Sequence, residues 1–93
     1  MVKHLDIIIT GKVQGVGFRF STKAVADQLG VKGFIKNESN GNVVIAAEGD
    51  DISLDMFLDW CNEGTEDAIV NSVQTSTGEL KNYRNFELVK KGF

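Results

Sequence analysis

Residues 11–19, Gly-Lys-Val-Gln-Gly-Val-Gly-Phe-Arg, combine the residue types that proteins use to bind an anion. The segment follows an apolar stretch, passes through Gly15 and Gly17, and ends on Arg19, where an amphipathic helix is predicted to begin. A helix start exposes backbone N–H groups without intrahelical partners, together with the positive end of the helix dipole. Glycine allows a positive φ and a close approach to the backbone, and arginine offers a planar set of donors that matches phosphate oxygens. The segment therefore predicts a phosphate-binding loop.

The common nucleotide-binding motifs do not account for this segment. A Rossmann fingerprint needs a third glycine where Phe20 stands, and a Walker A loop needs Gly-Lys-Ser/Thr, which does not occur. A plain strand-to-helix turn, with Arg19 as a solvated surface charge, also fits the spacing. Because short glycine motifs often arise by chance, both interpretations stay open at this point.

The hydrophobic pattern predicts the elements that must position the loop. Strands are expected at about 5–9, 31–37, 42–48, 68–75 and 85–89, and helices at about 20–29 and 52–63. Asn40-Gly41 predicts a hairpin turn between the second and third strands. The second helix is expected to be capped by Asp50 or Asp51 and to bury Met56, Phe57, Trp60 and Cys61. We therefore expect one domain over residues 1–93, a ferredoxin-like α/β sandwich of order βαββαβ, with an antiparallel sheet and both helices on one face.

This order places a second polar residue near the loop. A strand-helix-strand unit makes the second strand run parallel to the first. Asn37 ends the second strand and should therefore lie at the same end of the sheet as residues 14–19. Asparagine also commonly serves a turn by bonding to the backbone, so the residue type alone leaves both roles open for Asn37.

Two blocks of the sequence resemble the signature segments of the acylphosphatases. The blocks are residues 11–19 and the Gly33-Phe34-Ile35-Lys36-Asn37 segment followed by Asn40-Gly41-Asn42-Val43, and their order and spacing match the family. The resemblance implies hydrolysis of the carboxyl-phosphate bond of small acyl phosphates to a carboxylate and inorganic phosphate. It also implies catalytic roles for Arg19 and Asn37, no metal and no cofactor, and a phosphate site made by Gln14, Gly15, Val16, Gly17, Phe18 and Arg19.

The reactive side chains of the sequence favour the same substrate class. The sequence shows no Ser-His-Asp pattern and no metal-ligand cluster, and its one histidine, His4, is expected to be exposed at the far end of the first strand. An acyl phosphate releases a carboxylate of pKa about 4 to 5, which departs without a general acid. The reaction then needs mainly positioning and charge stabilisation. We expect Arg19 and backbone N–H groups to hold the phosphate, Asn37 to orient the attacking water, and a phosphate oxygen of the substrate to receive the proton.

Composition argues against several other classes of protein. A net charge of −3 is unsuited to a general nucleic-acid surface. Residues 43–47 of the third strand carry none of the aromatic side chains on which RNA-binding modules of this fold stack bases. The charged amino terminus predicts neither a signal peptide nor a membrane span, so a cytoplasmic protein is expected. Cys61 cannot form an internal disulfide and is expected to be a buried, small apolar residue.

The expected ligands are a small acyl phosphate as substrate and inorganic phosphate as product or inhibitor, with the protein acting as a monomer. A non-catalytic domain that senses phosphate or an acyl phosphate would use the same loop, because fold alone does not decide function. Turnover of an acyl phosphate by the purified protein separates these two alternatives.

Overall fold

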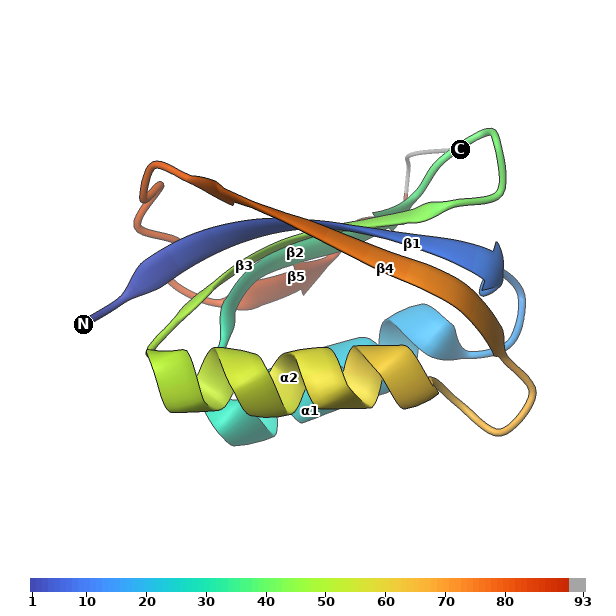
Figure 1. Cartoon of the computed structure of the whole chain (residues 1–93), viewed down its shortest axis with the longest axis horizontal. Helices are drawn as coiled ribbons and strands as arrows, with labels where there is room; N and C mark the ends of the chain where they lie inside the picture. The colour runs from blue at the N-terminus through green and yellow to red at the C-terminus, as the bar shows by residue number, and fades with distance from the viewer. Residues whose placement is uncertain (91–93) are drawn as a thin grey trace.

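Seven elements follow one another along residues 1–90, the part of the chain that the computed structural model describes. They are β1 (Lys3–Lys12), α1 (Phe18–Leu29), β2 (Lys32–Asn37), β3 (Val43–Gly49), α2 (Asp51–Glu63), β4 (Ile69–Gly78) and β5 (Phe86–Leu88). The strands form one sheet, and both helices lie against the same face of it (Figure 1). The predicted ferredoxin-like sandwich is confirmed. Neither helix in this part of the chain is long and apolar enough to cross a membrane.

The sheet has the strand order β4-β1-β3-β2-β5. β1 pairs antiparallel with both β3 and β4, and β2 pairs antiparallel with β3. Because β1 and β2 both run opposite to β3, they point the same way, as the sequence predicts. The sheet is nevertheless mixed rather than wholly antiparallel, since β5 pairs with β2 in parallel. The chain reaches that position because the connection after β4 crosses from one edge of the sheet to the other (Figure 1).

The hydrophobic core fills the space between the sheet and the helices. In β1 the alternation of side chains buries Ile7 and Ile9 on the helix-covered face and leaves Ile8 partly exposed on the other. All elements except β4 contribute residues to this core, and so do the loops after β1 and α1. The core residues are Ile7, Ile9, Val13, Phe18, Ala26, Val31, Ile35, Val43, Ile45, Ala47, Leu54, Phe57, Cys61 and Phe86. Side chains of β4 contribute only as partly buried neighbours of this cluster.

The buried face of α2 differs from the predicted one at two positions, Leu54 and Met56. Leu54, Phe57 and Cys61 are buried, and Trp60 is half-buried against the core. Met56 was expected inward, but its side chain is 53% exposed. Successive helical residues are about 100° apart around the axis, so the residue that precedes Phe57 projects to the side of the buried stripe. The expectation for Cys61 is confirmed, and its burial raises the pKa of the thiol to about 12.

His4 is buried, so the expectation that it is exposed is wrong. Its Nδ1 lies 2.8 Å from Oε2 of Glu48, and its Nε2 lies 3.0 Å from Oδ1 of Asp6. The connection between β4 and β5 covers this end of the helix-free face, because the backbone N–H groups of Lys81 and Tyr83 donate to the Glu48 carboxylate at 2.6 and 3.2 Å. The cover comes from a distant loop, which the alternation within β1 cannot reveal.

The His4 contacts predict a stability that depends on pH. Burial by itself would lower the pKa of His4, but the hydrogen bonds to Glu48 and Asp6 outweigh it and raise the pKa above the ordinary 6.5. A raised pKa in the folded state gives stabilisation that is complete below the unfolded value and is lost as the pH rises through the folded value. We expect the free energy of unfolding of the wild type, measured by urea denaturation, to fall as the pH is raised from about 6 to 9. His4→Gln should lack that component of the decline, and an identical decline in both proteins would contradict a charged His4.

Candidate active site

A buried side chain flanks the loop between β1 and α1 on each side. Val13 before it and Phe18 after it are each only 1% exposed. Between these anchors, Gly15 and Gly17 both adopt a φ of 72°, a left-handed conformation that costs little only for glycine. The two positive φ values let the short loop curve around an open space beside the start of α1.

The start of α1 carries an uncompensated positive potential. Gly17 is its N-cap and supplies no side-chain hydrogen bond, and the first turn contains no acidic residue. At the start of α2, by contrast, acidic side chains compensate the positive potential. The side chain of the N-cap residue Asp50 accepts a hydrogen bond from the Ser53 N–H at 2.7 Å, and Asp51 follows in the first turn. Free N–H groups together with the helix dipole make the first turn of α1 suited to a bound anion.

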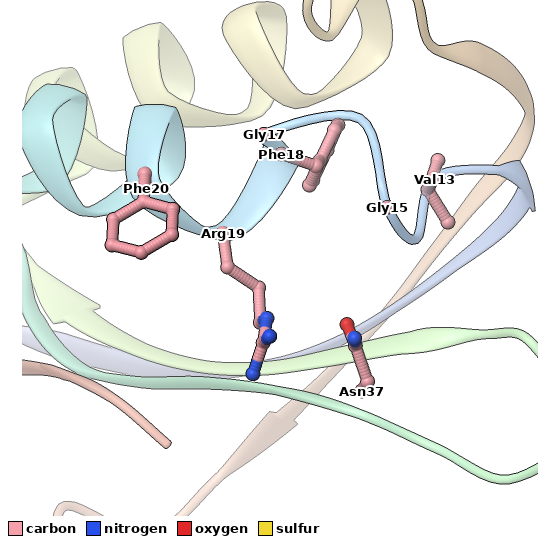
Figure 2. A pocket seen from close by; sticks show the side chains of 7 residues that line it. All are labelled: Val13, Gly15, Gly17, Phe18, Arg19, Phe20 and Asn37. Carbon is pink, nitrogen blue, oxygen red and sulfur yellow. The ribbon is translucent and has the colours of Figure 1, made fainter. Parts of the chain in front are cut away.

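A cavity of about 120 Å³ opens in front of this helix start. Its walls come from the loop, from the first turn of α1 and from the end of β2, and its lining residues are Val13, Gly15, Gly17, Phe18, Arg19, Phe20 and Asn37. Figure 2 shows Arg19 reaching down from α1 and Asn37 rising from β2 on the opposite side of the same space. The predicted meeting of the loop with Asn37 therefore occurs.

Gln14 and Val16, which the sequence also predicts as phosphate ligands, are not among the lining residues. The side-chain amide of Gln14 donates to the carbonyl oxygens of Glu38 and Asn42 at 2.7 and 2.9 Å, which fastens the loop to the β2–β3 turn. The Val16 carbonyl accepts a hydrogen bond from the Thr65 hydroxyl at 3.1 Å. Both residues shape the loop, and their direct contact with phosphate stays a prediction.

Arg19 is held in place by a partner that the sequence did not indicate. Its Nη1 donates to the carbonyl oxygen of Val89, just after β5, at a distance of 2.7 Å. This bond uses one donor of the guanidinium and leaves others free to face the cavity. Sequence reasoning missed Val89 because the acceptor is a backbone carbonyl, which any residue type supplies.

Asn37 presents an unsatisfied acceptor. Its Oδ1 is buried and has no hydrogen-bond partner within residues 1–90. Buried polar atoms are bonded in the great majority of cases, and each exception calls for a specific explanation. Because the side chain also lines the cavity, Oδ1 is available to accept a hydrogen bond from a donor bound there.

Within residues 1–90, no candidate metal site accompanies the cavity. Across the described part of the chain, no three His, Cys, Asp or Glu side chains are grouped so that they could hold a metal ion. The polar groups at the cavity are instead a guanidinium, an amide and backbone N–H donors. Such a set is suited to bind and orient an anion.

The fold and this cavity together define a class of protein, a small α+β domain with a cavity suited to an anion at a strand-to-helix loop. The acylphosphatase family model matches residues 5–88. An acylphosphatase from Archaeoglobus fulgidus is 44% identical over 84 residues, which cover 90% of this chain and 94% of that protein. The crystal structure of acylphosphatase from Bacillus subtilis is similar with a TM-score of 0.91 at 32% identity, over 96% of this chain and 99% of that one. The chain belongs to the acylphosphatase family.

A similar domain also occurs within a longer protein. The crystal structure of full-length HypF, in its phosphate- and nucleotide-bound form, matches with a TM-score of 0.90 at 30% identity. The match covers 96% of this chain but only 12% of the HypF chain.

The geometry around Arg19 predicts that a positive charge alone at this position is insufficient for full catalytic activity. Lysine keeps the positive charge but cannot bond to Val89 and to two phosphate oxygens at once, because it lacks the planar fork of donors. We expect Arg19→Lys to lose about two orders of magnitude in kcat/KM for an acyl phosphate, the loss typical of removing one donor to a developing oxyanion. Arg84→Lys is the matched control, since Arg84 is exposed and is not among the residues that line the cavity. Near-normal turnover by a folded Arg19→Lys variant would contradict this role.

Proposed function

We propose that the protein is an acylphosphate phosphohydrolase in which water attacks the phosphorus atom directly, without a metal and without a covalent intermediate. The observation that carries this proposal is the unpartnered Oδ1 of Asn37, buried in the same cavity as Arg19 and the uncapped start of α1. The cavity thus combines an anion-binding side with an acceptor that suits a water molecule.

The phosphoryl group is held by the loop and the first turn of α1. Backbone N–H groups from Gly15 to Arg19 and the free donors of the guanidinium surround its equatorial oxygens, where charge is spread in the transition state. Gln14 and Val16 support this arrangement through their contacts with Glu38, Asn42 and Thr65. Because these donors are fixed before the substrate binds, little reorganisation is needed during the reaction.

Asn37 orients the nucleophile. A water molecule that donates to Oδ1 has a lone pair free to attack phosphorus, on the side opposite to the leaving group. The new O–P bond forms as the bond between phosphorus and the acyl oxygen breaks, and that electron pair leaves with the carboxylate. An amide is too weakly basic to take the proton of the water, so the proton passes to a phosphate oxygen. The leaving carboxylate has a pKa of about 4 to 5 and needs no general acid.

We further propose that the protein acts as a monomer in the cytoplasm, with inorganic phosphate as product and inhibitor. The proposed mechanism uses only Arg19, Asn37 and backbone N–H groups of this chain, so it does not require a second subunit. The buried, unpaired thiol of Cys61 suits a reducing compartment.

The reaction class is tested by comparing two substrates. With acetyl phosphate and phenyl phosphate, each assayed in the presence and absence of a strong chelator, we expect hydrolysis of acetyl phosphate only, at a rate that the chelator does not change. The reason is the leaving group, because phenoxide has a pKa of about 10 and would need a general acid that the cavity lacks. Binding of inorganic phosphate without turnover of either compound would indicate a sensor, and loss of activity with chelator would refute the metal-free mechanism.

A further inference from the structure

Two adjacent rows of side chains run along α1. The residues of the first row are buried, recur every four positions, and are Phe18, Thr22 and Ala26. The second row consists of Arg19, Lys23 and Asp27, each displaced by one residue, or about 100° around the helix axis, from a member of the first. Packing into the core therefore holds one side of α1, whereas the side that carries Arg19 presents charged groups.

Arg19 and Lys23 both donate to backbone carbonyl oxygens of the β5 segment. Nη1 of Arg19 lies 2.7 Å from the oxygen of Val89, and Nζ of Lys23 lies 2.9 Å from the oxygen of Phe86. The donors are about one helical turn apart on α1. The two bonds therefore attach α1 to the β5 segment at two points, and the second point removes the freedom to rotate about the first.

The β5 segment has few other contacts that fix its distance from α1. β5 is a strand of three residues at the edge of the sheet, so only β2 pairs with it. The Val89 N–H donates to the Ile35 carbonyl at 2.9 Å, which sets the position of the segment along β2, and the Phe86 ring is buried in the core. Within residues 1–90, the hydrogen bonds that join α1 to this segment are those of Arg19 and Lys23.

The position of the Val89 carbonyl determines the orientation of the Arg19 guanidinium. The guanidinium is a rigid planar fork, so the bond made by Nη1 decides where the remaining donors point. Arg19 lines the same cavity as Asn37, and these donors are the ones available to a bound phosphoryl group. A misplacement of about 1 Å at a reacting site can cost about 100-fold in rate, so a small movement of Val89 affects turnover.

We propose that Lys23 is a positioning residue for the hydrolytic reaction, because its bond to Phe86 holds β5 where the Val89 carbonyl keeps Arg19 in its productive orientation. Lys23 is not among the residues that line the cavity, so it acts through Arg19 and not on the phosphoryl group itself. Its ion pair with Asp27, at 3.0 Å between partly exposed side chains, contributes little by itself. This inference rests on the proposed function, which assigns the phosphoryl group to the Arg19 side of the cavity.

The test is a double-mutant cycle with acetyl phosphate as substrate. We expect Lys23→Met, which keeps a long unbranched side chain but cannot donate, to lower kcat/KM about tenfold when Arg19 is present. In the Arg19→Lys background the same substitution should change kcat/KM less than about twofold, because no planar fork remains to be aligned. Lys23→Arg keeps a donor for the Phe86 carbonyl and should stay within about threefold of the wild type.

Asp27→Asn is the matched control. It removes the ion pair with Lys23 but leaves the Lys23 ammonium able to donate to Phe86, so kcat/KM should stay near the wild-type value. The Kd of inorganic phosphate provides a readout that does not depend on turnover. It should rise for Lys23→Met and not for Asp27→Asn, since Arg19 takes part in holding the phosphate.

The possible outcomes separate this inference from the reaction itself. Near-normal kcat/KM in Lys23→Met would show that β5 keeps its place without the Lys23 bond. Equal losses in both Arg19 backgrounds would show that Lys23 acts through its charge or through general support of the fold, and an equally impaired Asp27→Asn would assign the effect to the ion pair. Each of these results overturns the role of Lys23 while the hydrolytic function stands. A wild-type protein that does not hydrolyse acetyl phosphate would overturn the proposed function, and the phosphate Kd values would then decide the role of Lys23.

Discussion

The burial of Phe18 is the constraint on which the site depends. The ring is 1% exposed and lies 5.3 Å, centroid to centroid, from the indole of Trp60 on α2. With its first residue Phe18 fixed in the core and Gly17 as its N-cap, α1 has its free N–H groups facing the space beside the loop. Successive residues are about 100° apart on a helix, so the burial of Phe18 also turns Arg19 out of the core and toward the cavity. Packing and anion binding thus depend on the same helix start.

Sheet topology supplies the second half of the site. Both β1 and β2 pair antiparallel with β3, so the carboxyl ends of β1 and β2 lie at the same end of the sheet. Asn37 ends β2 there, and Gln14 fastens the loop to the neighbouring turn. The segment after β5 adds a third support through the bond between Arg19 and Val89. Three distant parts of the chain therefore hold two side chains and a row of N–H groups around one small space.

Parts of this arrangement are visible in the sequence because they depend on local chemistry. The glycines of the loop, the arginine after them and the alternation of Ile7 and Ile9 each follow from spacing and residue type. The position of Asn37 near the loop follows from the handedness and direction of a strand-helix-strand unit. These features require no knowledge of distant contacts beyond the order of the elements.

Most of the features that sequence reasoning missed depend on distant contacts. His4 is buried by a loop that follows β4, and β4 continues to Gly78 because it pairs with β1 as far as His4. The parallel β2–β5 pairing depends on where the chain crosses the sheet, and the support of Arg19 is a backbone carbonyl. The exposure of Met56 is a smaller error, caused by a buried stripe on α2 that begins at Leu54 and passes beside it.

The most direct test of this mechanism separates phosphate binding from the positioning of the attacking water. Turnover of acetyl phosphate and the Kd of inorganic phosphate are measured for wild type, for Asn37→Ala and for the control Asn62→Ala on the exposed side of α2. Because Asn37 is assigned to the water and Arg19 with the loop to the phosphate, Asn37→Ala should lose at least about two orders of magnitude in kcat while its phosphate Kd stays within about twofold. A folded Asn37→Ala variant that loses phosphate binding in parallel with turnover, or one that keeps near-normal turnover, would contradict the account.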